Sequence, residues 1–502
     1  MTIGVGRSVQ VTGVSGQVIE LYADLSHGLP SVTVIGDGML RESRDRVRAA
    51  LTNSGEHWPD SRVILAASAP VVEPSASHDL ALAVGVLDAT RVIPAQADSG
   101  TVFLGELCLD GRLRGERAVL PAVVTARDNN YRTVVVPEAA LPQLGLVEGI
   151  EIVGARDLRA VLAWLRYQHP LAQPGRVELR YPPPAIDLAH VAGQPHAKWA
   201  LEVAAAGGHH LALVGSPGVG KTLLAQCLPA ILPPLTDAQA LEVAAIASAA
   251  GVLDHQLISR MPPYIAAHHS ASVPGMLGGG WRLLPGAVSR AHHGVLFLDE
   301  VTELGSKVCE ALRTPLDCGQ VHLGRAGTTV TYPARFQLIA AASECACAAR
   351  TDGDCVCTPA TRFRYWNRFT SAWADRLDIW VRLSSSRLQR NTAANETSAA
   401  VRERVTAARD AAARRWSEHG VTTNAEVPGE VLRHRFPLPP AVVAPVESAL
   451  RAGGISTRGV DRVVRLAWTL CDLRAGSTPN AHDITDALLL HRRPALTGPA
   501  DS

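Results

Sequence analysis

The stretch LALVGSPGVGKTLLAQCL, residues 211–228, decides the fold. Its first four residues form an apolar run typical of a buried strand, residues 215–222 fit the pattern G-x-x-x-x-G-K-S/T, and a helical pattern begins at Thr222. A strand, a glycine-rich loop and a helix in this order bind phosphate, because successive backbone N–H groups and the helix N-terminus point to one spot. The sequence therefore predicts a nucleotide-binding site on an α/β core.

Lys221 is the conspicuous residue of this loop. The sequence holds 48 lysine and arginine residues, and its lysines are Lys198, Lys221 and Lys307. A compact, mobile ammonium reaches the β- and γ-phosphates of a nucleotide, which a planar guanidinium does not mimic there. The Thr222 hydroxyl is the expected ligand for Mg²⁺. The residues expected to bind ATP in this loop are Gly215, Ser216, Pro217, Gly218, Val219, Gly220, Lys221 and Thr222.

A second apolar run, GVLFLDE at residues 294–300, ends in two acids. A strand of an α/β sheet delivers such residues at its carboxyl end, where these sheets bind ligands. Asp299 is expected to complete the Mg²⁺ shell, and Glu300 to polarise the attacking water. Two acids after a buried strand can be purely structural, but their place roughly 80 residues after the phosphate loop favours nucleotide hydrolysis.

Composition bounds the class of protein. At 502 residues, with 47% hydrophobic and 19% charged residues, the chain is long enough for about two to four globular domains. A net charge of +1 gives no global attraction to nucleic acid, so DNA binding needs a local basic patch. Apolar runs shorter than the roughly 18 residues of a membrane span, and an opening without a signal-peptide core, predict a cytoplasmic protein with no membrane attachment.

The pattern of periodic segments divides the chain into regions. Strand-like runs and helical runs alternate in the first part, at Gln17–Tyr22, Ser31–Ile35, Arg62–Ala67 and Arg132–Val136 for strands and at Arg41–Asn53 and Asp79–Leu87 for helices. Proline and arginine punctuation then indicates an extended linker. The predicted regions are an amino-terminal domain 1–168, a linker 169–186, an α/β core 187–383, a helical region 384–495 and a disordered tail 496–502.

With both halves of the nucleotide site identified, the chain resembles the magnesium-chelatase-like AAA+ ATPases of the YifB/ComM type over essentially its whole length. The resemblance implies an α/β multidomain fold with an AAA+ P-loop core and a helical carboxyl-terminal lid. The stretches that carry it are GLPSVTVIGDGMLRESRDRVRAALTNSG (28–55), AKWALEVAAAGGHH (197–210), PPLTDAQALEVAAIASAAG (233–251), HHSASVPGMLGGGWRLLPGAVSRAHHGVLFLDE (268–300), RAGTTVTYPARF (325–336) and STRGVDRVVRLAWTLCDL (456–473).

The stretch FLGELCLDGRLRGERAVLPAVVTA, residues 103–126, is similar to the Lon-protease-type domain of the ribosomal S5 domain 2-like fold. A working protease of that type needs a serine nucleophile activated by a nearby lysine. The first 197 residues contain no lysine, and Pro121 falls near the expected site. Arginine cannot act as the base. We therefore expect a binding or assembly module without a protease dyad.

The resemblance also implies catalytic arginines. Arg376, in ADRLDI, resembles an arginine finger offered to the γ-phosphate of a neighbouring subunit, and Arg368 is a second candidate. A finger that acts on a neighbour implies a homo-oligomeric ring, expected to be a hexamer. Arg458, in STRGVDR, resembles the sensor-2 arginine of the helical lid.

Two departures from the family pattern bear on hydrolysis. Ser343, in AAASECACA, stands at the sensor-1 position where the family usually has asparagine. A hydroxyl still holds a water, with shorter reach and fewer donors than an amide. The stretch PPYIAAHH, residues 262–269, lacks two arginines that the family has there. Slow hydrolysis or altered coupling is therefore an open alternative.

Four of the nine cysteines crowd into a short stretch. Cys345, Cys347, Cys355 and Cys357 form the pattern C-x-C-x7-C-x-C, short enough to bring four thiolates around one Zn²⁺. C-x-C is less usual than C-x-x-C, because a single intervening residue strains both thiolates onto one metal. A structural zinc site and four reduced cysteines in a loop stay open as alternatives.

Three histidine pairs, at residues 209–210, 268–269 and 292–293, look ligand-like. Adjacent side chains on a strand point to opposite faces, so we do not expect a pair to bind one metal. Packing or hydrogen-bonding roles are favoured. The pair at 268–269 lies in the family motif near the nucleotide, with no role assigned.

The segment GQVHLGRAGTTVTYPARF, residues 319–336, alternates around the turn RAG and predicts a β-hairpin. In the wider helicase clade that the chain resembles, such a hairpin projects into the channel of the ring. Arg325 is placed to touch DNA phosphates, and its repetition around a ring gives sequence-independent binding. A hairpin used for subunit packing is the alternative.

Three functions are compatible with these patterns. The first is an ATP-driven motor on single-stranded or branched DNA, for which the resemblance implies branch migration in recombination and transformation. The second is a chelatase-type or protein-remodelling ATPase that needs a partner with a D-x-S-x-S site; the nearest match here is DLSHG at 24–28. The third is a weakly hydrolysing, nucleotide-gated scaffold.

Overall fold

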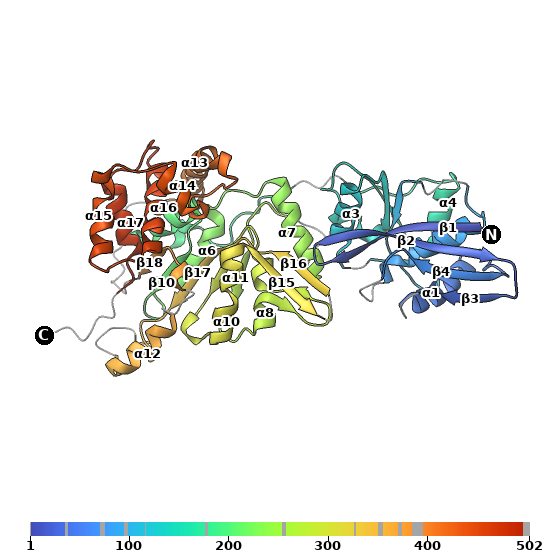
Figure 1. The fold of residues 1–502 in the computed structure, drawn as a ribbon, viewed down its shortest axis with the longest axis horizontal. Helices are drawn as coiled ribbons and strands as arrows, with labels where there is room; N and C mark the ends of the chain where they lie inside the picture. The colour runs from blue at the N-terminus through green and yellow to red at the C-terminus, as the bar shows by residue number, and fades with distance from the viewer. Residues whose placement is uncertain are drawn as a thin grey trace.

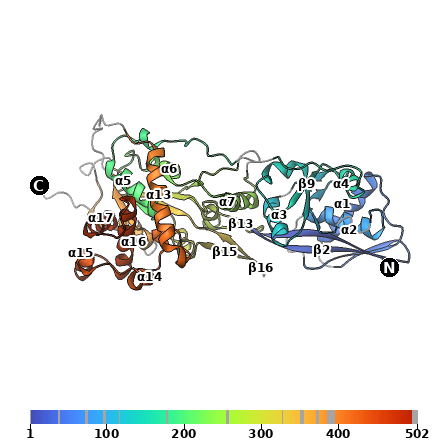
Figure 2. The same ribbon diagram turned by 90° about the horizontal axis from the view of Figure 1, so that it is seen from above.

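The computed structural model describes residues 2–35, 39–70, 76–94, 99–115, 117–175, 179–253, 258–325, 328–349, 355–369, 374–383 and 395–494. The described part of the chain is elongated (Figure 1). Amino-terminal sheets occupy one end, a central sheet with its helices the middle, and a helical bundle the other end. The same order appears in the view from above (Figure 2).

The amino-terminal end contains two larger sheets. One is four-stranded in the order β1–β2–β4–β3, and the other is a parallel sheet in the order β5–β8–β9. The strands are β1 (Thr2–Thr12), β2 (Ser15–Ser26), β3 (Ser31–Val34), β4 (Arg62–Ala67), β5 (Thr101–Phe103), β6 (Glu106–Leu107), β7 (Leu113–Arg114), β8 (Thr133–Pro137) and β9 (Glu151–Ala155). The helices are α1 (Met39–Asn53), α2 (Asp79–Ala89), α3 (Val119–Asp128) and α4 (Leu158–Leu165). The Lon-protease-like assignment of this end stays a prediction.

Strand β1 is absent from the sequence-based expectations because Gly4 and Gly6 interrupt its pattern. Both positions are glycine because helix α2 lies directly against β1 there. A Cβ at Gly4 would lie 2.1 Å from the carbonyl oxygen of Gly85, and a Cβ at Gly6 would lie 1.8 Å from that of Ala81. Strand and helix approach each other this closely because no side chain stands between them.

Five parallel strands in the order β11–β14–β17–β10–β18 form the central sheet. Strand β10, which leads into the phosphate loop, pairs with β17, and β17 pairs with β14, so the carboxyl ends of these three strands meet at one edge. The strands are β10 (Leu211–Val214), β11 (Tyr264–Ala267), β14 (Val295–Leu298), β17 (Gln337–Ala342) and β18 (Ile379–Arg382). The helices of this part are α5 (Pro195–Gly207), α6 (Lys221–Ile231), α7 (Asp237–Ala250), α8 (Val273–Leu277), α9 (Ala287–Arg290), α10 (Ser306–Ala311), α11 (Arg313–Cys318) and α12 (Pro359–Phe369).

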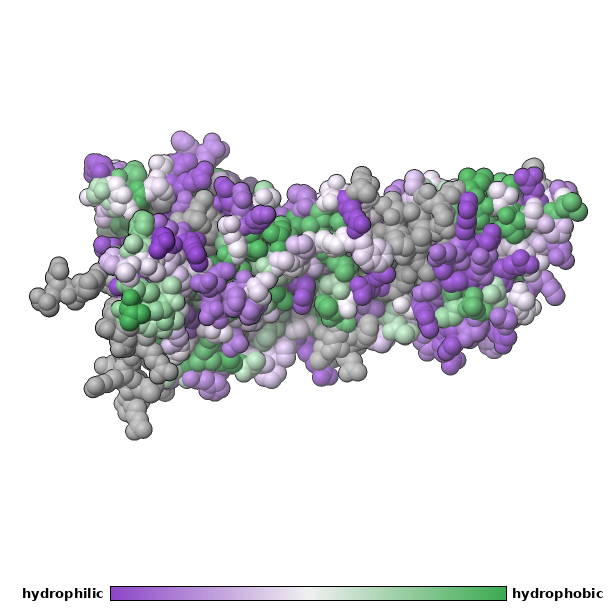
Figure 3. Space-filling model, turned by 90° about the horizontal axis from the view of Figure 1, so that it is seen from below, coloured by the Kyte–Doolittle hydropathy of each residue, from purple (hydrophilic) through white to green (hydrophobic). Residues whose placement is uncertain are grey.

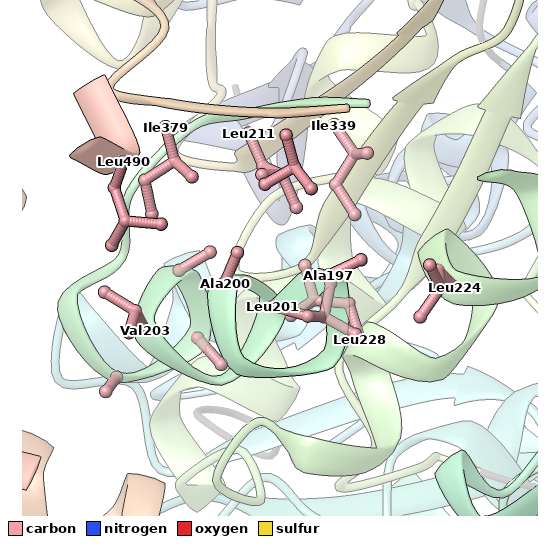
Figure 4. Packing of buried hydrophobic residues seen from close by; sticks show 14 of the residues in the cluster. Ala197, Ala200, Leu201, Val203, Leu211, Leu224, Leu228, Ile339, Ile379 and Leu490 are labelled. Atoms are coloured by element: carbon pink, nitrogen blue, oxygen red, sulfur yellow. The ribbon is translucent and has the colours of Figure 1, made fainter. Parts of the chain in front are cut away.

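Strands and helices of the central part share one buried apolar cluster (Figure 4). Its strand residues are buried and, apart from Phe297, aliphatic, because helices cover the sheet. Alanines on α5 keep that helix close to the sheet. The labelled residues of the cluster are Ala197, Ala200, Leu201, Val203, Leu211, Leu224, Leu228, Ile339, Ile379 and Leu490.

The carboxyl-terminal end is helical, as the sequence predicts. Its helices are α13 (Ser398–Trp416), α14 (Gly429–His434), α15 (Pro440–Arg451), α16 (Thr457–Leu473) and α17 (Ala481–His491). Thr397 caps α13 by accepting a hydrogen bond from the backbone N–H of Ala400. The boundary at 384 and the tail 496–502 lie outside the described residues.

Asp378 joins the central sheet to this helical end. Nε of Arg462 on α16 lies 3.1 Å from its carboxylate, and the His491 ring on α17 lies 2.8 Å from its backbone oxygen. Burial by itself would raise the pKa of Asp378, but the His209 ring 3.4 Å from its carboxylate and the charge of Arg462 hold it well below its ordinary value. The carboxylate is therefore ionised and binds α16, while the backbone oxygen of Asp378 binds α17.

Two antiparallel hairpins stand beside the sheet. Strands β15 (Gln320–Arg325) and β16 (Thr328–Pro333) form the predicted hairpin, with Arg325 opposite Thr328 at its turn. The short strands β12 (Gly278–Gly279) and β13 (Leu284–Pro285) form the second.

The described residues of the predicted linker form no helix or strand beyond isolated bridges, such as Arg180 with Ser259. Hydrophilic and hydrophobic residues are interspersed on the face shown in Figure 3. Within the described ranges, no helix has both the length and the apolar character to cross a membrane.

Candidate nucleotide-binding and hydrolysis site

The loop of residues 215–222 leaves the end of β10 and enters α6 at Lys221. The predicted order of strand, loop and helix is thus confirmed. Gly218 and Gly220 have φ angles of +80° and +98°, a backbone conformation that other residues rarely adopt. The loop therefore curls so that its N–H groups and the start of α6 face one point, which suits a phosphate.

The Lys221 ammonium lies inside this curl. Its Nζ donates to the carbonyl oxygens of Gly215 at 2.6 Å and Ser216 at 3.0 Å. Burial lowers the pKa of Lys221, and the carboxylates of Asp299, Glu300 and Glu344 act against that shift. The charge is thus held at the loop by its own backbone and by nearby acids.

Asp299 and Glu300 follow β14 at the same edge of the sheet. The Thr222 hydroxyl donates to the Asp299 carboxylate at 3.1 Å, so the two expected Mg²⁺ ligands are adjacent. A hydroxyl and a carboxylate are oxygen ligands of the kind that Mg²⁺ prefers. The second carboxylate oxygen of Asp299 accepts the backbone N–H of Glu300 at 3.0 Å, which fixes the orientation of the group.

Glu300 is positioned by a histidine that sequence reasoning left without a role. Its backbone is left-handed, with φ of +48°, which turns the side chain away from the direction of the strand. Nδ1 of His269 lies 3.2 Å from Oε2 of Glu300. Both side chains are partly exposed, so the carboxylate is oriented while staying open to water.

Ser343 comes directly after β17, the strand between β10 and β14. Its side chain is buried. The next residue, Glu344, accepts two hydrogen bonds from Arg382 at the end of β18, at 2.7 and 2.8 Å. The structure thus brings Ser343 to the same edge as the loop and the two acids, while its sensor-1 role stays a prediction.

The candidate arginines lie in three different settings. Arg376 pairs with Asp317 of α11 in its own chain, a partner that sequence reasoning missed. Arg368 is exposed on α12, with Nη1 3.9 Å from Glu303. Arg458 is exposed in the first turn of α16.

Comparisons with known proteins find similarity along nearly the whole chain. Residues 187–391 match the family described as "Magnesium chelatase, subunit ChlI", residues 21–140 match "Subunit ChlI of Mg-chelatase", and residues 395–491 match "Magnesium chelatase, subunit ChlI C-terminal". An uncharacterized protein of Mycobacterium tuberculosis is 47% identical over 97% of this chain and 98% of the relative. YifB of Escherichia coli is 33% identical over 99% of this chain and 100% of the relative, and competence protein ComM of Haemophilus influenzae is 33% identical over 94% of each.

The chain belongs to the YifB/ComM family of magnesium-chelatase-like AAA+ proteins. Its chemistry in general is therefore that of an AAA+ ATPase, which uses a nucleotide and Mg²⁺. Thr222 and Asp299 are the side chains that would hold the ion, which supplies charge stabilisation to the phosphates. The roles expected from the sequence, Lys221 on phosphate oxygens and Glu300 at the attacking water, stay predictions, and His269 beside Glu300 agrees with the second of them.

The prediction that adjacent histidines point to opposite faces is wrong for the pair at residues 292–293 of this YifB/ComM-family protein. His292 and His293 do not point to opposite faces: Nε2 of each lies within 3.0 Å of the same oxygen of Glu242 on α7. The pair lies in a turn before β14, not in a strand, and His293 has φ of +56°. Nδ1 of His292 accepts the backbone N–H of Arg335, so its Nε2 carries the proton and donates to Glu242. The predicted hydrogen-bonding role is confirmed, and this tautomer disfavours a metal.

Proposed function

We propose that this AAA+ ATPase is a homo-oligomeric ring motor, most simply a hexamer, that uses ATP hydrolysis to move single-stranded or branched DNA. Branch migration of recombination junctions is the activity we assign to it. The observation that carries this proposal is the exposure of Arg325, Trp281 and Arg282 on two hairpins that contact each other. The name of one relative, competence protein ComM, supports a link to DNA taken up during transformation.

The two hairpins pack on each other. The Tyr332 hydroxyl of β16 donates to the carbonyl oxygen of Leu283 beside β13 at 3.0 Å. The backbone of Gly278 in β12 is so close to Leu323 of β15 that a Cβ there would lie 3.0 Å from the leucine side chain. The described strands of the two hairpins are therefore held against each other.

Exposed residues on these hairpins suit a nucleic acid. Arg325 is exposed at the end of β15. On the other hairpin, the Trp281 side chain is 58% exposed, and the Arg282 guanidinium lies 4.3 Å from the centre of its ring. An indole stacks on an unpaired base and a guanidinium binds phosphate, so the pair favours DNA with unstacked bases. Sequence reasoning missed Trp281 and Arg282. The signal that could have found them is a tryptophan and an arginine directly after three glycines, which indicate a turn that exposes both side chains.

A ring would add an arginine of the neighbouring subunit to the hydrolysis site. We assign Arg376 to the γ-phosphate of the neighbouring subunit and Arg458 to the nucleotide of its own chain. Arg376 must then exchange Asp317 for that phosphate when subunits meet. Arginine fingers of this kind contribute about 10³- to 10⁵-fold to hydrolysis.

The test is the ATPase rate of the purified chain with and without single-stranded and four-way-junction DNA, with Glu300→Gln as the blank. We expect DNA to stimulate hydrolysis and Arg325→Ala to remove most of the stimulation while the rate without DNA is kept. Arg112→Ala is the matched control, because this arginine is 74% exposed on the amino-terminal end. Stimulation should weaken with salt, as phosphate contacts do.

The other outcomes identify the alternatives. Hydrolysis that is indifferent to every DNA would contradict the motor and support action on a protein partner. ATP binding without hydrolysis would point to a nucleotide-gated scaffold, with Ser343 at the sensor-1 position as the reason.

A further inference from the structure

Four cysteine side chains converge beside the hydrolysis site. The Sγ atoms of Cys345, Cys347, Cys355 and Cys357 all lie within 4.8 Å of one another. Cys345 is 3.1 Å from Cys347 and 3.4 Å from Cys355, and Cys347 is 3.6 Å from Cys355. The C-x-C-x7-C-x-C stretch thus places four sulfurs around one point, as its spacing predicts.

These distances suit a tetrahedral metal better than a disulfide. Sulfurs in a disulfide are about 2.05 Å apart. Sulfurs bound to one Zn²⁺ at about 2.3 Å stand roughly 3.8 Å apart in a tetrahedron, which small side-chain rotations reach from the observed positions. An all-sulfur ligand set favours zinc over magnesium or calcium.

We propose that Cys345, Cys347, Cys355 and Cys357 bind one Zn²⁺ and that this ion positions the elements on both sides of it at the hydrolysis site. Each thiol releases its proton to solvent as its Zn–S bond forms, which leaves a closed site with a net charge of −2. The metal site is independent of the proposed action on DNA.

The chain on both sides of the cluster leads to the nucleotide. Cys345 follows Ser343 and Glu344, and Glu344 holds Arg382 with two hydrogen bonds. Cys357 precedes α12. The Tyr365 hydroxyl of this helix accepts a hydrogen bond from the hydroxyl of Thr302, which lies two residues after Glu300. A metal that fixes the two ends of this stretch therefore fixes Ser343 on one side. On the other side it fixes α12, which contacts the segment that follows Asp299 and Glu300.

The first experiment measures metal in the full-length chain purified under reducing conditions. We expect about one Zn²⁺ per chain by elemental analysis, and Co²⁺ in its place should give the absorption of a tetrahedral thiolate site. Cys345→Ser and Cys355→Ser should lose both signals. Cys318→Ser is the matched control, an exposed free cysteine outside the cluster, and should keep both.

Two further measurements protect the result against misfolding. Cys357→His retains a ligand that zinc accepts, so it should keep the metal where Cys357→Ser loses it. Circular dichroism shows whether each variant is folded. A folded wild-type chain with four freely titrating thiols, no zinc and no Co²⁺ spectrum would overturn the metal site.

The positioning role has its own readout. Removing zinc from the wild-type chain should leave ATP binding within about twofold and lower kcat by about tenfold or more, since a misplaced group costs rate rather than affinity. Zinc that is present but leaves kcat unchanged on removal would contradict the positioning role. A loss of DNA stimulation alone, with basal hydrolysis kept, would also contradict it.

Discussion

Nδ1 of His269 and Oε2 of Glu300 lie 3.2 Å apart, just past the ends of two neighbouring parallel strands of the central sheet. Ala267 pairs with Leu298, and each partner of the contact stands two residues beyond these, just past the end of its strand. The strand register therefore sets the contact. A histidine two residues after β11 in this way orients the carboxylate two residues after β14.

His269→Ala should lower kcat for ATP hydrolysis by about tenfold, because general-base catalysis depends on orientation as well as on the base. ATP affinity should be nearly unchanged, since His269 contacts Glu300 rather than the phosphate loop. Single-turnover hydrolysis and nucleotide binding measure the two effects. His268→Ala is the comparison, since its Nδ1 lies 2.7 Å from the Ser270 hydroxyl. An equal loss in both variants would contradict a specific role for His269.

Mixing two inactive variants tests whether Arg376 acts on a neighbour. Glu300→Gln removes the base but keeps the arginine, and Arg376→Ala does the reverse, so a mixed ring contains complete sites at some interfaces. We expect each variant alone to be at least about 10³-fold slower than the wild type, and the mixture to recover a substantial part of the rate. A mixture as inactive as its components would mean that the arginine serves its own chain.

Acid should destabilise the chain through buried histidines. Burial lowers the pKa of His78 to about 4, and burial together with His293 lowers that of His292 to about 4. An unfolded histidine takes up its proton near its ordinary value of 6.5. Between these values the unfolded state binds more protons, so the free energy of unfolding falls as the pH falls from 6.5 towards 4, by up to about 3 kcal/mol per histidine.

Urea unfolding at about pH 7 and about pH 5 measures this slope. His78→Asn should flatten it, because asparagine does not titrate. His482→Asn should leave it unchanged, since that histidine side chain is 82% exposed. A slope that is the same in all three proteins would show that His78 carries a proton in the folded state.

Gly6→Ala should destabilise the amino-terminal end by about 2 kcal/mol or more, the cost of overpacking. The added methyl would lie 1.8 Å from the carbonyl oxygen of Ala81, so β1 and α2 must separate. Limited proteolysis and thermal unfolding report the change. Gly324→Ala is the control, because an added Cβ there meets nothing within 4 Å. Equal melting of the two variants would contradict the packing argument.

The parts of the site that were predictable from sequence are those encoded within a few neighbouring residues. The phosphate loop is one continuous stretch, and Asp299 and Glu300 end one apolar run, so their local patterns suffice. The four cysteines converge because their spacing is short. In each case chain connectivity limits the possible distances, and the residue types then indicate the chemistry.

Contacts between distant segments were not predictable in this way. His269 meets Glu300 through strand order, and Arg376 meets Asp317 across the fold. His292 and His293 were misassigned because the strand rule was applied to a turn. The pairing of β1 with β2 was hidden by glycines that serve packing against α2. Strand register and helix packing supply the information that local patterns lack.

Asp378 stands two residues after Arg376, and its side chain and backbone are tied to α16 and α17. Any tilt of the helical end against the sheet must therefore move the short segment that carries Arg376. In a ring, that segment would face the next subunit. A change in the position of one chain's helical end would then move the Arg376 segment at the site of the neighbouring subunit. Hydrolysis would thereby pass from one subunit to the next in order.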